Sequence, residues 1–159
     1  MSVALAPKRH GGGLELSDGE SPRLSGGPVV LFDGVCNLCN GAVNFIIDRD
    51  PHGWFRFASL QSAAGQELLR AHGLEPGRMD SLVCIAEGRA HLKSAALIAI
   101  ARGLGGGWRL PALAGSVLPR FLRDWCYDRV AANRYRWFGR REVCRVPDAD
   151  LLERFLDGG

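Results

Sequence analysis

The chain has 159 residues, of which 47% are hydrophobic and 23% are charged, a size and composition that suit one globular domain. Its 20 basic and 17 acidic residues give a formal net charge of +3, an excess too small to predict a nucleic-acid-binding protein. No segment approaches the roughly 18 consecutive apolar residues that cross a bilayer. We therefore expect no transmembrane segment.

The first 27 residues are rich in Gly, Ser and Pro and lack the apolar run of about 7 to 15 residues that a signal peptide contains. They are expected to form a disordered leader, followed by a core at 28–104 and a helical extension at 105–159 packed on that core. A cytoplasmic location is expected by default. In that reducing compartment a pair of cysteines is more often catalytic or metal-binding than a structural disulfide.

The first predicted strand is the short apolar run Val29–Phe32, which suits a strand buried on both faces of a sheet. An Asp-Gly turn at 33–34 ends it. Apolar residues then recur at helical spacing over Val35–Arg49, so a helix is predicted there, with Cys36 and Cys39 in its first turn.

A second strand is predicted over Trp54–Ala58, where Phe55 and Phe57 alternate with a polar residue. Two strands joined through a helix form a parallel pair with a right-handed crossover. A second helix is predicted over Gln61–Ala71, with a glycine following as its C-terminal stop.

The segments Ser81–Ala86 and Arg89–Lys93 flank the dipeptide at 87–88, Glu-Gly, which predicts a β-hairpin with a tight turn. Ser94 is expected to be the N-cap of a third helix over Ala95–Arg102. The resulting order of strand, helix, strand, helix, hairpin, helix is that of a thioredoxin-like α/β fold.

Helical segments are predicted over 108–138, broken by Pro111 and Pro119, and a final short helix is predicted over Asp148–Leu156. One helix face is expected to pack on the core through Leu118, Leu122, Trp125 and Val130.

The segment FDGVCNLC, which contains Asp33, Cys36 and Cys39, resembles the Asp-x-x-Cys-x-x-Cys signature of the DCC family of thiol-disulfide oxidoreductases. The resemblance runs from about Pro28 to Cys144 and includes NRYRWFGRR at 133–141, which is similar to that family's C-terminal signature. It implies a thioredoxin-like fold and a redox-active dithiol. We expect thiol or disulfide partners, either proteins or small molecules, and no cofactor.

The two cysteines would gain reactivity from their position. The spacing alone is weak evidence, since five scattered cysteines would produce it by chance about one time in eight. A helix N-terminus, however, directs unpaired N–H groups and positive potential at Cys36 and favours its thiolate. We expect Cys36 to be exposed and to attack a disulfide, and Cys39 to face inward and resolve the mixed disulfide.

A non-enzymatic module is the alternative. The same two thiolates could contribute to a zinc or iron-sulfur site completed by Cys144 or by a second chain. The four histidines are dispersed and form no ligand set with the two cysteines at a recognised spacing.

Asp33 has two interpretations of equal weight. Its carboxylate could accept the proton of Cys39 as that thiol attacks. It could instead bond the N–H groups of the following turn, as Asp before Gly commonly does.

The remaining cysteines are expected to be bystanders, with Cys84 and Cys126 in the core and Cys144 next to a basic turn. The segment 129–141 interleaves arginines with aromatic residues, which suits contact with phosphate or a membrane surface. The favoured interpretation is that its aromatic side chains pack on the core while its arginines stay solvated or pair with acids.

Overall fold

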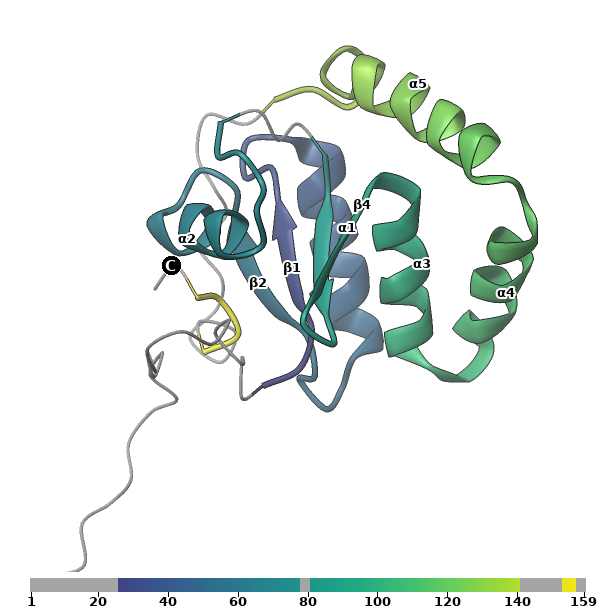
Figure 1. The fold of residues 1–159 in the computed structure, drawn as a ribbon, viewed down its shortest axis with the longest axis horizontal. Coiled ribbons are helices and arrows are strands. Elements are labelled where there is room, and N and C mark those ends of the chain that lie inside the picture. Colours follow the sequence, from purple (N-terminus) through teal and green to yellow (C-terminus); the bar gives the residue numbers. More distant parts are fainter. Residues whose placement is uncertain (1–25, 78–80, 141–152, 157–159) are drawn as a thin grey trace, which may run out of the picture.

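The structure is a computed structural model that describes residues 26–77, 81–140 and 153–156 (Figure 1). A four-stranded sheet has the order β2-β1-β3-β4. The strands are β1 (Val29–Phe32), β2 (Arg56–Ser59), β3 (Val83–Ala86) and β4 (Arg89–Leu92), and only the β1–β2 pair is parallel. The helices are α1 (Asn37–Arg49), α2 (Ala63–Ala71), α3 (Lys93–Leu104), the 3-10 helix η1 (Gly106–Trp108), α4 (Arg109–Val117) and α5 (Arg120–Phe138). The predicted thioredoxin-like α/β fold is confirmed.

The sheet has a hydrophobic core on each face because the side chains of a strand alternate between faces. In β1, Val30 and Phe32 contact the cluster formed with α1 and α3. Val29 and Leu31 contact the second cluster, formed with α2. All four side chains are buried, as expected for a central strand, and the helices therefore cover both faces of the sheet (Figure 1).

The hairpin of β3 and β4 is confirmed, and its turn consists of Glu87 and Gly88 alone. Both residues have positive φ, 53° and 72°, as the two-residue turns that match the strand twist require. Ala86 pairs directly with Arg89 across the turn.

Two helix starts differ from the predictions. α1 begins at Asn37 rather than Val35, so Cys36 is its N-cap residue and only Cys39 lies in the first turn. α3 begins at Lys93, so Ser94 is not an N-cap. The Ser94 hydroxyl instead donates to the Asp124 carboxylate of α5, which makes it a contact between two helices.

Of the two prolines predicted to break the C-terminal helical region, Pro119 does so and Pro111 does not. Pro119 is the N-cap residue of α5 and separates it from α4. Pro111 lies in the first turn of α4, where a helix tolerates proline because that N–H has no partner within the helix.

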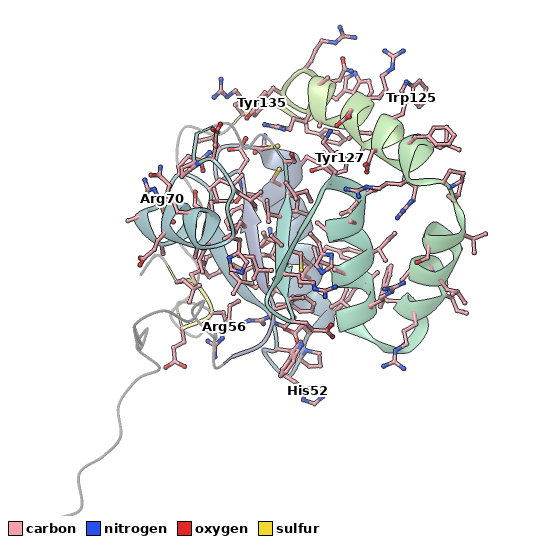
Figure 2. The ribbon with its side chains drawn as sticks, viewed as in Figure 1. His52, Arg56, Arg70, Trp125, Tyr127 and Tyr135 are labelled. Carbon is pink, nitrogen blue, oxygen red and sulfur yellow. The ribbon has the colours of Figure 1, made fainter. Side chains whose placement is uncertain are left out.

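The prediction for the buried face of α5 is wrong. The four apolar residues expected to pack on the core are exposed, Trp125 to 58%. The inward face is polar: Tyr127 accepts a hydrogen bond from the backbone of Leu82 at 2.8 Å, and Arg134 is buried. Figure 2 shows Tyr127 on the side of α5 that faces the sheet and Trp125 on the other side.

The described residues at the C-terminus do not end a helix as predicted. Residues 153–156 run beside β2, where the Phe57 N–H donates to the Arg154 carbonyl at 2.8 Å and the Leu156 N–H donates to the Phe57 carbonyl at 2.9 Å. Phe155 also packs against Phe57. This segment covers the β2 edge of the sheet, and residues 148–152 of the predicted helix lie outside the described residues.

Within the described ranges, no helix is both long and apolar enough to cross a membrane. Residues 1–25 of the predicted leader lie outside those ranges. The boundaries of the leader, core and extension stay predictions.

Candidate active site

Asp33 and Cys36 lie in the short connection between β1 and α1. The Cys36 N–H donates to the Asp33 carbonyl at 3.2 Å, and the Val35 N–H donates to Asp33 Oδ1 at 3.2 Å. Asn40 fixes the same loop from inside the helix, since its Nδ2 donates to the carbonyls of Gly34 and Cys36 at 2.8 and 2.9 Å. These hydrogen bonds hold the connection between β1 and α1 in place, and Cys36 therefore lies at the N-terminus of α1.

The expectation that Cys36 is exposed is wrong, because its exposed fraction is 0%. The chain just after α5 runs across the start of α1 (Figure 1). Asn37 Nδ2 donates to the Phe138 carbonyl at 2.8 Å, the Asn37 N–H donates to the Gly139 carbonyl at 3.4 Å, and Arg140 forms a β-bridge with Cys36. We call residues 138–140 the cover segment.

Cys39 lies one turn into α1, half-buried, and both it and Cys36 are free thiols. Burial, a hydrogen bond with Cys36 and the charge of that neighbour raise the pKa of Cys39 to about 12. The backbone of Asp33 and the positive charge of Arg134 act in the opposite direction, more weakly. Cys39 therefore keeps its proton at neutral pH.

The Asp33 carboxylate is buried and accepts four hydrogen bonds. The donors are Val35 N–H and Gln61 Nε2 on Oδ1, at 3.2 and 2.9 Å, and Arg134 Nη2, at 3.2 Å, and the Tyr135 hydroxyl on Oδ2. Burial alone would raise the pKa of Asp33, but these contacts outweigh it and hold the pKa below its ordinary value of 3.8. Asp33 is therefore an anion, and its bond to Val35 is the turn interaction that the sequence suggested.

Arg134 and Tyr135 reach Asp33 from the last turns of α5, about a hundred residues along the chain. Burial alone would lower the pKa of Arg134, but its contacts with Tyr135 and Asp33 raise it, so the guanidinium stays charged. Burial and the bond to Asp33 raise the pKa of Tyr135, which stays a neutral donor. Figure 2 shows Tyr135 at the C-terminal end of α5.

The prediction for segment 129–141 is confirmed for one arginine and wrong for two aromatic residues. Arg134 pairs with an acid, Asp33, as expected of these arginines, although it is buried. Trp137 and Phe138 do not pack on the core, since both are about half exposed. Arg141 lies outside the described residues. The signature NRYRWFGRR pointed to this segment, but its composition did not show which side chains face inward.

Gln61 was missed as well. It follows β2 as Asp33 follows β1, and these two strands are parallel. The carboxyl ends of neighbouring parallel strands meet at one edge of the sheet. The predicted parallel pair could therefore have placed Gln61 beside Asp33.

Of the three other cysteines, the structure describes Cys84 and Cys126. Cys84 is buried in the core, as predicted, and burial raises its pKa to about 12. The prediction that Cys126 is buried is wrong, since it is exposed on the outer side of α5. Cys144 lies outside the described residues. Among those the structure describes, no three His, Cys, Asp or Glu side chains form a group that could hold a metal ion.

The chain is similar in sequence to known proteins. The model of the DCC1-like thiol-disulfide oxidoreductase family matches residues 30–140, which include the cysteine pair, Asp33 and Arg134. The chain is 52% identical to the Bacillus subtilis protein YuxK over 128 residues, 80% of this chain and 93% of YuxK. It is 41% identical to the chloroplastic DCC family protein At1g52590 of Arabidopsis thaliana over 119 residues, 75% of this chain and 69% of that protein. No solved structure matches the chain. The chain belongs to the DCC1-like thiol-disulfide oxidoreductase family.

Proposed function

We propose that the protein exchanges disulfides with protein or small-molecule thiols through Cys36 and Cys39. The observation that carries the proposal is the placement of two free thiols, one hydrogen-bonded to the other, at the N-terminus of α1 directly after β1. The family to which the chain belongs carries the same activity in its name.

The proposed reaction is a two-step exchange. The Cys36 thiolate attacks one sulfur of a substrate disulfide, forms a mixed disulfide and releases the first substrate thiolate. Cys39 then loses its proton and attacks Cys36 Sγ, which closes the Cys36–Cys39 disulfide and releases the second substrate thiolate. The substrate gains two electrons and the protein dithiol loses two. The high pKa of Cys39 supports its assignment to the second step, because that thiol stays protonated until then.

Asp33 is assigned a positioning role rather than that of proton acceptor. Its lowered pKa makes it a weak base, and four donors already occupy its two oxygens. In the proposed mechanism it holds Arg134 near the dithiol, where the guanidinium charge favours the thiolate that Cys39 must form. The proton of Cys39 passes to solvent or to the departing substrate thiolate.

An equilibrium redox titration tests the proposed function. The full chain is equilibrated in glutathione buffers, the remaining thiols are alkylated, and each cysteine is followed by mass spectrometry. We expect Cys36 and Cys39 to lose alkylation together in one two-electron transition between about −270 and about −120 mV. The metal content of protein purified without chelator tests the alternative. One bound metal per chain, lost when both cysteines are replaced, would establish the metal-binding module.

Access to Cys36 requires the cover segment to move, and Gly139 is the position at which this can be tested. Gly139 has φ +78°, and a Cβ there would lie 3.2 Å from Asn37 Nδ2. Alanine in left-handed backbone costs about 1–2 kcal/mol, which corresponds to an increase of about tenfold in opening of the segment. Gly139→Ala is therefore expected to speed alkylation of Cys36 by about that factor.

Gly73→Ala is the matched control. Gly73 also has positive φ, +69°, and a Cβ there meets nothing within 4 Å. The control is expected to lose comparable stability without a change at Cys36. Equal alkylation rates in the wild type, Gly139→Ala and Gly73→Ala, followed peptide by peptide, would mean that the cover segment does not control access.

A further inference from the structure

The outer side of α4 and α5 carries large apolar side chains that no described residue covers. Two helical stripes, one on each helix, meet at the turn through residue 118. Val117 and Phe121, on either side of that turn, are 80% and 76% exposed. We call this the elbow surface, and its residues are Leu110, Leu113, Val117, Phe121, Leu122 and Trp125. Monomeric soluble proteins rarely expose so many neighbouring apolar groups without a partner.

Arginines border the elbow surface and give it positive charge. α4 and α5 together contain six arginines and two aspartates. Both aspartates already have partners, since Asp124 bonds Ser94 and Arg120, and Asp128 pairs with Lys93. The charge available on this side is therefore that of exposed arginines.

Arg129 and Arg136 share the outer side of α5 with Trp125. The three positions follow one another at intervals of four and seven residues, which places them on one helix face. The Arg129 guanidinium lies 5.4 Å from the Trp125 ring centroid, a cation–π contact. Apolar, aromatic and cationic groups are thus mixed on a single exposed face.

We propose that the elbow surface binds an anionic lipid bilayer, with α4 and α5 lying in the headgroup region. Helices that do so combine Trp, Phe and Leu with Arg or Lys, and anionic lipid supplies the charge that complements the arginines. A second copy of the chain suits the surface less well, because a twofold contact would bring the arginines of one copy against those of the other.

The proposal does not depend on the dithiol chemistry. The residues of the elbow surface lie on the outer sides of α4 and α5, whereas Arg134, which bonds Asp33, is on the buried side of α5. Variants of the elbow surface are therefore expected to keep the redox transition of the parent in solution. Loss of that transition in the parent would contradict the proposed function and leave lipid binding intact.

Vesicle flotation with the full chain tests the proposal. Vesicles of phosphatidylcholine alone are compared with vesicles that contain about one third phosphatidylglycerol. We expect binding to the anionic vesicles, weakened when salt rises from about 0.05 M to about 0.5 M, because salt screens surface charge. Absence of binding to anionic vesicles at low salt would overturn the proposal.

Three variants locate the contact. Phe121→Ser with Trp125→Ser is expected to weaken binding at least about tenfold, since both side chains would be inserted. Arg129→Gln with Arg136→Gln is expected to weaken binding to anionic vesicles by about fivefold for each arginine. Trp54→Ser is the control, because Trp54 is exposed but lies before β2, outside the elbow surface.

Two results would overturn the proposal even if the protein floats with vesicles. One is equal binding by the Phe121/Trp125 double variant and the Trp54 control. The other is a concentration-dependent dimer in sedimentation velocity that the double variant loses while its lipid binding stays unchanged, which would assign the elbow surface to a second copy of the chain.

Discussion

Replacement of Asp33 with asparagine is expected to lower the free energy of unfolding by about 3–5 kcal/mol at neutral pH, because it removes the carboxylate that pairs with the buried Arg134 guanidinium. Both side chains of the pair are 6% exposed, so water cannot compensate for the loss. The Tyr135 and Gln61 bonds to the carboxylate weaken at the same time. Urea unfolding of the reduced proteins measures the difference.

A double-mutant cycle isolates the ion pair from other effects. Arg134→Met removes the charge while it keeps an unbranched side chain, so Asp33→Asn combined with Arg134→Met leaves neither ion unpaired. The double variant is expected to be less destabilised than the sum of the two single variants. Additive losses would mean that the two residues contribute independently.

The same pair predicts how stability depends on pH. The folded pKa of Asp33 lies below its ordinary value of 3.8, so the folded state releases this proton more readily than the unfolded state. The stabilisation is therefore complete above about pH 5 and is lost as the pH falls through the folded pKa. In the Asp33→Asn variant, the free energy of unfolding is expected to lack this decrease at acid pH.

Asp50→Asn is the matched control, because it removes a buried ion pair that lies away from Cys36. Asp50 is also buried and paired, with Arg154 at 2.5 Å, but it lies at the opposite end of α1. Both variants are expected to lose stability. Only Asp33→Asn is expected to speed alkylation of Cys36, because Asp33 holds the end of α5 that leads into the cover segment.

The contrast between these parts of the molecule shows what the sequence could predict. The junction of strand and helix at Cys36 and the Glu87–Gly88 turn are local, since neighbouring residues determine them. The buried face of α5 is not. Burial is ordinarily inferred from apolar periodicity, whereas α5 buries Arg134 and exposes Trp125.

The burial of Cys36 could not be predicted for a related reason. It depends on the Asn37 bonds to Phe138 and Gly139, which lie about a hundred residues further along the chain. No local pattern reports such a contact. Gln61 is the intermediate case, because the parallel pairing of β1 and β2 could have placed it beside Asp33.

The largest effect on activity is expected for Cys36→Ser, which should reduce turnover to the rate without protein. A serine hydroxyl cannot form the mixed disulfide, and Cys39, with its pKa raised to about 12, is a poor substitute at neutral pH. The assay is reduction of insulin disulfides by dithiothreitol. Cys126→Ser is the control, because Cys126 is exposed and lies outside the dithiol site, and it should keep the parent rate.

Cys39→Ser distinguishes the order of the two steps. Cys36 can still attack, but nothing within the site resolves the intermediate, so a mixed disulfide between Cys36 and the substrate should accumulate and be visible by mass spectrometry without reductant. If the mixed disulfide instead accumulates on Cys39 in the Cys36→Ser variant, the half-buried thiol is the nucleophile and the assigned roles are reversed. Turnover at the parent rate in both variants would mean that the dithiol is not catalytic, because disulfide exchange would then need neither thiol.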